Sequence, residues 1–135
     1  MTSGPFLLDT HVIIWIFEDS SQLSRNALAA IKPSLSAAHR GALVVSVASF
    51  WEVITKSRKK SMGIADPVTW WDRAVSSLDA TVLSIRPSHV VALAGLADHH
   101  QDPFDRILVA QTIAEGYTLI TKDPQMKRYT TRTLW

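Results

Sequence analysis

FLLDTHVIIW, residues 6–15, includes the first predicted strand and the start of the first predicted helix. The apolar run from Phe6 to Leu8 is typical of a buried strand, and an apolar segment of helical length begins directly after Asp9. In an open parallel sheet, ligands bind in the crevice beyond the carboxyl ends of the strands, where Asp9 is expected to lie. The alternative is that Asp9 only caps the following helix. The positions of the other acidic residues decide between the two interpretations.

Strand and helix patterns alternate along the rest of the chain. Further strands are predicted over residues 42–46, 81–85 and 117–121, with a short fifth strand over 132–135. Helices are predicted over residues 11–18, 25–38, 67–78, 87–97 and 104–115, and another begins at Ser46 or Ser49 and continues to Lys60. Pro33 should kink or divide its helix. The alternation predicts one α/β domain over residues 1–135, a three-layer sandwich whose mainly parallel central sheet of four to five strands has helices on both faces.

Composition excludes several classes of protein. The 135 residues are 47% hydrophobic and 19% charged, which argues against disorder. The sequence has no cysteine, so disulfides, thiolate metal sites and a cysteine nucleophile are excluded. The five glycines occur singly, which disfavours a phosphate-binding loop. We find no signal peptide and no apolar run long enough to span a bilayer, and we therefore expect a cytoplasmic protein without a membrane partner.

Four acidic residues are predicted to lie at one end of the sheet. Asp123 follows the fourth strand as Asp9 follows the first, so both should face the same crevice. Glu52 lies about two turns into the helix that leaves the second strand, among apolar neighbours, so its carboxylate is either buried at a cost in free energy or needed for function. Asp105 lies in the first turn of the helix before the fourth strand. These positions can converge on a single pocket.

Each of the last three acids also has a purely structural interpretation. Asp123 precedes a proline and could be a turn residue. Glu52 could pair with Lys56 at i,i+4 on a solvated helix face. Asp105 could form a capping box with Asp102, which stands before Pro103 as the expected N-cap. Because all four acids are predicted to lie together, a shared functional site explains them better than separate structural roles do.

Clustered carboxylates repel one another, so a fold that gathers them is expected to bind a cation. Oxygen ligands suit Mg²⁺ or Mn²⁺, and two such ions about 3.5–4 Å apart can promote phosphodiester hydrolysis. The sequence contains no histidine cluster with zinc-site spacing; His99 and His100 are adjacent and are expected to be loop residues.

Several stretches together resemble a known family: LLDTHV at residues 7–12, SFWEV at 49–53, HQDPFDR at 100–106 and LITKD at 119–123. They are similar to the PIN-domain ribonucleases, and more closely to the VapC-like toxins of type II toxin–antitoxin pairs. The resemblance covers essentially the whole chain. It implies a metal-dependent endoribonuclease with Mg²⁺ or Mn²⁺ as cofactor, a homodimer, and inhibition by a small cognate antitoxin. By motif position it implies that the catalytic and metal-binding residues are Asp9, Glu52, Asp105 and Asp123, supported by Thr121 and Asp102.

Basic residues near these acids provide possible contacts with RNA phosphates, which give affinity without sequence readout. The net charge of +2 is too small to argue for RNA binding by itself. The alternative for these residues is an ordinary solvated surface. The candidates are Lys56, Arg58, Lys59, Lys60, Arg106, Lys122, Lys127, Arg128 and Arg132.

Apolar helical residues are numerous for so small a domain. Residues 12–17 and the pair Trp70–Trp71 could leave an exposed patch for a dimer partner or an antitoxin. Either tryptophan could stack on a base, but adjacent helical residues diverge, so at least one should lie in the core or an interface.

Two other functions remain open at this point. A haloacid-dehalogenase-type phosphatase also uses an aspartate after its first strand, but it needs a second acid two residues later, where this chain has His11. A non-catalytic module that binds RNA or an antitoxin would keep the acidic pocket only as structure.

Overall fold

The computed structural model describes residues 4–59, 62–129 and 131–135. The strands are β1 (Phe6–Leu8), β2 (Leu43–Ser46), β3 (Thr81–Leu83), β4 (Thr118–Ile120) and β5 (Arg132–Leu134). The α-helices are α1 (Thr10–Glu18), α2 (Arg25–Ser34), α3 (Val47–Arg58), α4 (Pro67–Leu78), α5 (Pro87–Ala94) and α6 (Pro103–Glu115). Single 3₁₀ turns are η1 (Ser20–Gln22), η2 (Ala37–His39) and η3 (Met126–Arg128).

All five strands are parallel and lie in the order β3-β2-β1-β4-β5. β1 is central: Leu7 is in register with Val44 of β2 on one side and with Leu119 of β4 on the other. The ladder continues past β1, because the backbone N–H of Asp9 donates to the Ile120 carbonyl at 3.0 Å. The carboxyl ends of β1 and β4 therefore lie side by side, although they are far apart in the sequence.

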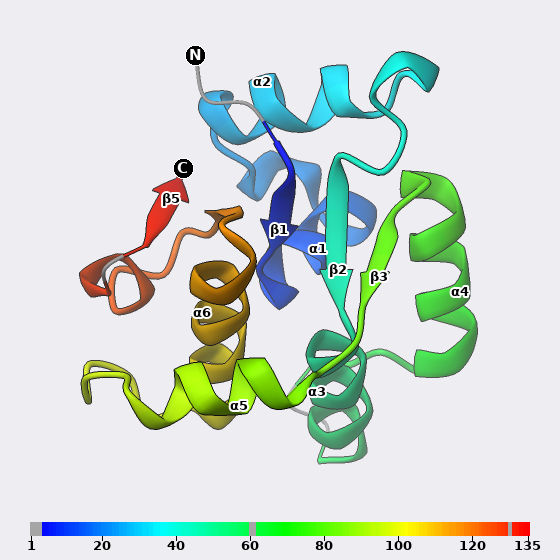
Figure 1. Cartoon of the computed structure of the whole chain (residues 1–135). Coiled ribbons are helices and arrows are strands. Elements are labelled where there is room, and N and C mark those ends of the chain that lie inside the picture. Colours follow the sequence, from blue (N-terminus) through cyan, green and yellow to red (C-terminus); the bar gives the residue numbers. More distant parts are fainter. Residues whose placement is uncertain (1–3, 60–61, 130) are drawn as a thin grey trace.

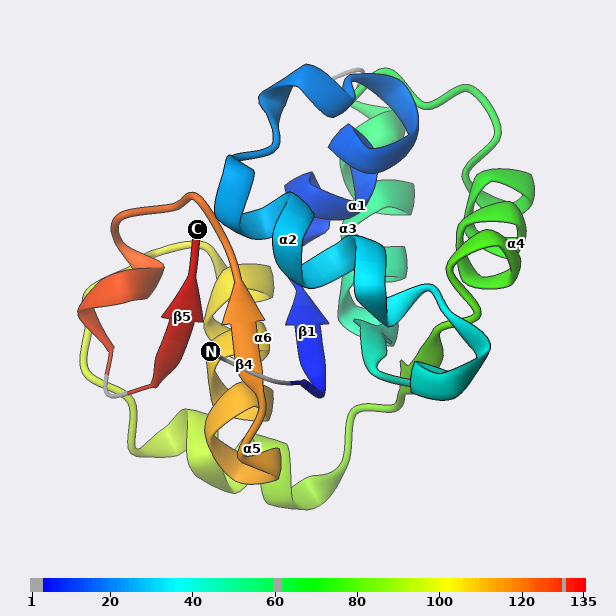
Figure 2. The ribbon, with the colours of Figure 1, turned by 90° about the horizontal axis from the view of Figure 1, so that it is seen from above.

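Helices cover both faces of the sheet, which confirms the predicted sandwich (Figures 1 and 2). Alternate β1 residues point to opposite faces. Leu8 joins the cluster formed with α1, α2 and α4, whereas Leu7 joins the cluster formed mainly with α6. α5 packs against the outer side of α6. The sheet is thus buried on both faces, as the continuous apolar strands predict.

Three predicted elements end earlier in the structure than the sequence suggests. The predicted helix 25–38 ends at Ser34, since Pro33 has no N–H to donate, and η2 follows as a separate turn. The predicted strand 81–85 ends at Leu83, because β3 is an edge strand with a partner on one side only. The predicted helix 87–97 ends at Ala94, with Gly95 as its C-cap.

Many of the apolar helical residues are buried in the core. Val12 and Ile13 are fully buried, and Trp71 is buried with its ring stacked on Phe50 at a centroid distance of 5.0 Å. The prediction that one tryptophan of the 70–71 pair lies in the core is confirmed. Phe17 remains partly exposed, so only part of the expected apolar patch lies at the surface. None of the helices in the described part of the chain has the length and hydrophobicity that a membrane span requires.

Candidate metal centre

Asp9 directs its carboxylate into the protein and does not cap α1. It occupies the N-cap position, yet its side chain accepts no hydrogen bond from the helix amides. Instead Oδ2 accepts a hydrogen bond of 2.7 Å from Oγ1 of Thr121, the residue after β4. Its other oxygen, Oδ1, is buried and has no hydrogen-bond partner among the described residues. A buried carboxylate oxygen without a partner is costly unless something else binds it.

Glu52 is 1% exposed, which rules out the solvated helix face. The predicted i,i+4 pair with Lys56 nevertheless forms, because the Lys56 ammonium contacts Oε2 of Glu52 inside the protein. The same ammonium lies 2.8 Å from Oδ2 of Asp102 and so links α3 to the start of α6. Oε1 of Glu52 is buried without a hydrogen-bond partner in the described part of the chain.

Asp102 is the N-cap of α6, as predicted. Its Oδ1 accepts hydrogen bonds from the backbone N–H groups of Phe104 at 2.8 Å and Asp105 at 3.2 Å. The Asp105 side chain does not reach back to complete a capping box; its Oδ2 lies 3.1 Å from Nε2 of His100. The structural interpretation of Asp105 is therefore wrong, and its carboxylate faces the other acids.

Asp123 is a turn residue, as one of its two interpretations predicts, and its side chain also faces the acidic cluster. Oδ1 accepts a hydrogen bond of 2.8 Å from the Gln125 amide, which stabilises the turn after β4. Oδ2 lies 2.8 Å from Nε2 of His100. The Asp123 backbone N–H donates to Oγ1 of Thr121 at 3.0 Å, so one hydroxyl orients both acids at the ends of β1 and β4.

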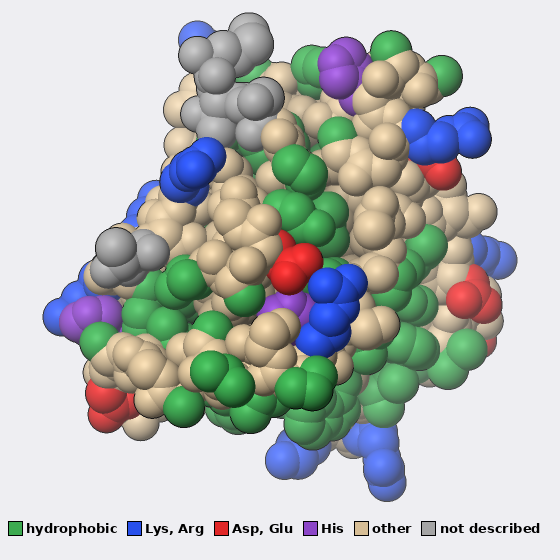
Figure 3. All heavy atoms as spheres, in the orientation of Figure 1, with side chains coloured by type: hydrophobic (Ala, Val, Ile, Leu, Met, Phe, Trp, Pro, Cys, Tyr) green, Lys and Arg blue, Asp and Glu red, His purple; other side chains and the backbone are tan. Residues whose placement is uncertain are grey.

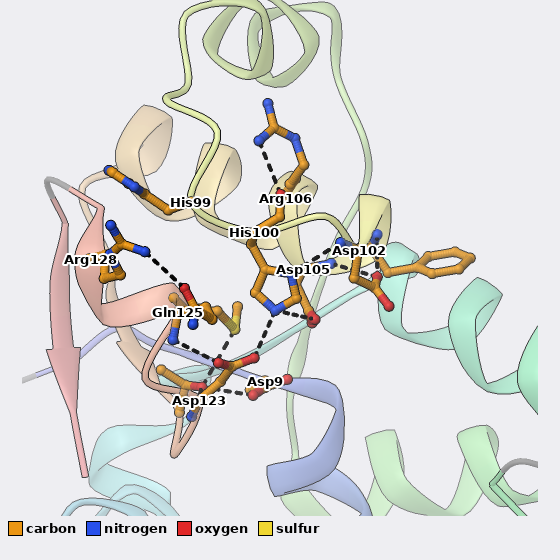
Figure 4. A network of polar contacts seen from close by, with 12 residues as sticks. Asp9, His99, His100, Asp102, Asp105, Arg106, Asp123, Gln125 and Arg128 are labelled. Atoms are coloured by element: carbon orange, nitrogen blue, oxygen red, sulfur yellow. Dashed lines mark hydrogen bonds and ion pairs between the residues drawn. The ribbon is translucent and has the colours of Figure 1, made fainter.

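His100 lies in the acidic cluster, which the sequence did not lead us to expect. It was expected to be a loop histidine, and it does belong to the loop before α6, but its ring points into the acidic cluster (Figure 4). The signal was its position two residues before an N-cap aspartate, from which an imidazole can reach the first helical turn. His99 points away in the same view and packs edge-on against Tyr129.

The side chains fall into two groups whose ligand atoms lie within 4.8 Å of one another, and Asp105 belongs to both. One group is Glu52, Asp102 and Asp105; the other is His100, Asp105 and Asp123. Asp9 lies close enough to Glu52 and Asp123 for the charges of both to raise its pKa. The structure thus gathers the four predicted acids in one place and adds His100 to them.

The electrostatics of the cluster disfavour full ionisation in the absence of a cation. Burial, followed by the negative charges of Asp9, Asp102, Glu52 and Asp123, raises the pKa of Asp105 to about 8. Burial also raises the pKa of Asp9, although the Thr121 hydrogen bond opposes this effect. A bound divalent cation would reverse the shifts and satisfy the unpartnered oxygens, so the donor set fits Mg²⁺ or Mn²⁺.

The pKa values of Asp102 and Lys56 shift so as to favour the charged forms, unlike those of Asp9 and Asp105, because the two side chains form an ion pair. Partial burial opposes ionisation of Asp102, but the Lys56 ammonium and the α6 amides outweigh it and lower the pKa of this carboxyl. Partial burial likewise opposes the charge on Lys56, but its bonds with Asp102 and Glu52 hold its pKa above the usual value. Lys56 is thus part of the cluster's framework.

The remaining RNA-contact candidates are spread over the surface. Arg58 and Lys59 are exposed at the end of α3, and Lys60 lies outside the described residues. The Lys122 ammonium lies 5.8 Å from the ring centroid of Trp15. Arg106 donates to the backbone carbonyls of Ala97 and His100 and thereby holds the loop before α6. On the face seen in Figure 3, Lys and Arg side chains form separate groups without a continuous basic patch.

An exposed aromatic side chain adjoins the centre. Trp51 precedes Glu52 on α3, is 58% exposed, and packs edge-on against Phe104 with a centroid distance of 4.9 Å. Phe104 follows the Asp102–Pro103 start of α6, and the Lys56 ammonium lies 5.7 Å from its ring centroid. The sequence analysis considered only Trp70 and Trp71 for base stacking.

The sequence model of the PIN domain matches residues 6–131. The chain belongs to the PIN-domain family. This PIN domain is 30% identical over 124 residues to ribonuclease VapC22 of Mycobacterium tuberculosis, covering 91% of this chain and 90% of the relative. Its fold is similar to that of VapBC2 from Rickettsia felis bound to a DNA fragment from its promoter, with a TM-score of 0.67, 14% identity and coverage of 95% of this chain and 96% of the other. DNA-bound VapBC from Salmonella typhimurium gives a TM-score of 0.67 at 16% identity, with 95% of each chain covered.

Proposed function

We propose that this PIN-domain protein is a metal-dependent endoribonuclease that acts as the toxin of a toxin–antitoxin pair. The observation that carries the proposal is the convergence of Asp9, Glu52, Asp105 and Asp123, with two buried carboxylate oxygens that lack partners among the described residues. Similarity to ribonuclease VapC22 supports RNA as the substrate. The phosphatase alternative is not supported, because the chain matches the PIN domain and His11 stands where a second acid is required.

Asp9, Glu52, Asp105 and Asp123 would hold Mg²⁺ or Mn²⁺. When bound, the metal would lower the pKa of a water molecule and neutralise the charge that develops on the phosphodiester. The protein orients the carboxylates: Thr121 fixes Asp9, Lys56 fixes Glu52, and the Asp102 cap fixes the helix start that carries Asp105. Thr121 and Lys56 add no negative charge to the cluster, and the charge of Asp102 is offset by its ion pair with Lys56.

The RNA would lie across the mouth of this cluster. Trp51 offers an exposed ring on which a base can stack, and Arg58 and Lys59 lie further along the same helix to contact phosphates. Such contacts give affinity for single-stranded or loop RNA without fixing a sequence. An RNA substrate of this kind also favours a cytoplasmic site of action.

The decisive experiment is an RNA cleavage assay with Mg²⁺ or Mn²⁺, with EDTA, and with the variant Asp9→Asn. Cleavage should need the metal and should be lost in Asp9→Asn, which stays folded because the amide has nearly the shape of the carboxylate. Asp72→Asn is the matched control, because Asp72 is exposed on α4, away from the acidic cluster. Full activity in EDTA or in Asp9→Asn would exclude the metal mechanism, whereas no cleavage by the unsubstituted chain with either metal would favour the non-catalytic RNA- or antitoxin-binding module.

The partners of the proposed toxin are a small antitoxin and a second copy of the chain. Similarity of the fold to VapBC complexes supports an antitoxin as partner. The partly exposed Phe17 is one residue of the expected apolar patch that does lie at the surface. Co-expression with the adjacent small gene should yield a complex that lacks nuclease activity. Sedimentation should give a dimer for the purified chain; a monomer at tens of micromolar (roughly the range of weak interfaces) would exclude the dimer.

A further inference from the structure

His100 is placed between two acids of the centre by a rigid backbone. The Tyr129 hydroxyl accepts hydrogen bonds from the backbone N–H groups of His99 at 3.1 Å and His100 at 2.9 Å. Arg106 donates to the His100 carbonyl at 3.3 Å and to the Tyr129 hydroxyl at 3.3 Å. This arrangement, with Tyr129 itself buried, fixes the loop so that the His100 ring enters the cluster (Figure 4).

The hydrogen bonds of the ring determine which nitrogen carries the proton. The backbone N–H of Asp102 points at Nδ1 of His100 with a distance of 3.0 Å, and a backbone amide can only donate. Nδ1 must therefore accept, so it carries no proton. The proton of the neutral ring then lies on Nε2, which faces Oδ2 of Asp123 at 2.8 Å and Oδ2 of Asp105 at 3.1 Å.

A nitrogen that carries a proton has no lone pair to offer a metal. For Nε2 to become a ligand, the proton would have to move to Nδ1, where it would meet the Asp102 N–H. The cost of two opposed donors in a partly buried site disfavours that tautomer. His100 is thus suited to donate to the carboxylates and unsuited to coordinate the cation.

We propose that His100 is a positioning residue of the metal centre, which donates its Nε2–H to Asp123 with Asp105 3.1 Å away on the same side and does not bind the metal itself. The inference rests on the proposed function, since it assigns a role toward the same cation. The donor offsets repulsion between the two carboxylates, and it leaves acceptor sites for the metal because each carboxylate has about four lone-pair positions. Residues that orient ligands in this way commonly change metal affinity by about 10–100-fold when they are replaced.

Three substitutions separate the two hydrogen-bonding functions of the ring. His100→Gln supplies an N–H donor close to the Nε2 position. His100→Asn supplies an acceptor for the Asp102 amide but does not reach the two carboxylates. His100→Ala removes both functions, and His99→Ala is the matched control because the His99 ring points away from the acids.

The test is calorimetric titration of each purified variant with Mn²⁺ and with Mg²⁺. We expect His100→Ala and His100→Asn to weaken binding about 10–100-fold, and His100→Gln and His99→Ala to stay within a few-fold of the unsubstituted protein. If His100→Ala does not fold, the comparison of Asn with Gln decides the question. Unchanged or tighter metal binding in His100→Asn would overturn the proposal.

Pulsed electron paramagnetic resonance of the Mn²⁺-loaded protein gives a second readout that is independent of activity. A positioning role predicts no coupling from a directly coordinated ¹⁴N nucleus. A ¹⁴N coupling that disappears in His100→Gln would show that His100 is a ligand and would overturn the inference. The proposed function fails in a different way, namely if the unsubstituted chain binds neither metal and cleaves RNA equally well in EDTA.

Discussion

Thr121 and Asp9 are joined by a buried hydrogen bond of 2.7 Å from Oγ1 to Oδ2 across the ends of β4 and β1. The same hydroxyl accepts the Asp123 backbone N–H at 3.0 Å. One small side chain therefore sets the orientation of the acid after β1 and the path of the chain toward the acid after β4. It also favours the ionised form of Asp9, whose burial acts in the opposite direction.

Replacing Thr121 by Val should weaken the centre without changing its charge. The Asp9 oxygen would lose its donor inside the protein, which costs about 1.5–3 kcal/mol for a hydrogen bond to a charged group. The pKa of Asp9 should rise further, so metal-dependent cleavage should need a more alkaline pH. Activity measured across pH for Thr121→Val and for Thr121→Ser, which keeps the hydroxyl, checks this; identical profiles for all three proteins would contradict it.

The stability of the metal-free protein should depend on pH through Asp105. Its pKa is about 8 in the folded protein and 3.8 ordinarily, so the folded state binds this proton more tightly than the unfolded chain. This contribution to stability is fully present below pH 3.8 and is lost as the pH rises through about 8. Urea unfolding in EDTA should therefore give a free energy of unfolding that falls over this range.

The variant Asp105→Asn should flatten that dependence and should raise the metal-free stability at pH 8, because it removes a carboxyl from a repulsive cluster. It should also lose the stabilisation by Mg²⁺ that the unsubstituted protein gains from binding to the native state. A slope between pH 4 and pH 8 that persists unchanged in Asp105→Asn would assign the effect to another group.

Asp102 should matter mainly for the start of α6. Asp102→Ala removes the acceptor for the amides of Phe104 and Asp105 and should cost about 0.5–2 kcal/mol, the usual effect of losing an N-cap. Asp102→Asn keeps a good cap and loses only charge toward Lys56. Measurable cleavage by both variants is expected. An inactive, fully folded Asp102→Asn beside a normally active Asp105→Asn would reverse the assignment of the two acids.

Trp51 should contribute to RNA binding and not to metal binding. Base stacking on an aromatic ring is worth about 1–3 kcal/mol, so Trp51→Ala should raise the KM for RNA about 5–160-fold with kcat little changed. Trp51→Phe should keep most of the affinity, and Val91→Ala on α5 controls for the loss of an exposed apolar side chain. If RNA affinity is unchanged while antitoxin binding is lost, the ring belongs to the protein interface.

The predictable parts of the fold are those determined by local chemistry. Asp102 followed by Pro103 identified the start of α6 correctly, and the apolar run before Asp9 identified β1 as a buried strand. The place of His100 could not be predicted, because it depends on Tyr129 and Arg106, which hold the loop from outside it. The burial of Glu52 was ambiguous for a related reason. Its pair with Lys56 can form on an exposed or on a buried helix face, and only the packing of α3 in the fold determines which of these is present.

The strand order has a consequence for synthesis of the protein. β1 is synthesised long before its sheet neighbour β4, because the helices α1 to α6 and the strands β2 and β3 lie between them in the sequence. Until β4 has been released and has paired with β1, Asp9 lacks the Thr121 hydroxyl and the cluster lacks Asp123. A nascent chain therefore cannot assemble the acidic centre before residues 118–123 have left the ribosome, and until then the chain has no complete site for cleaving RNA.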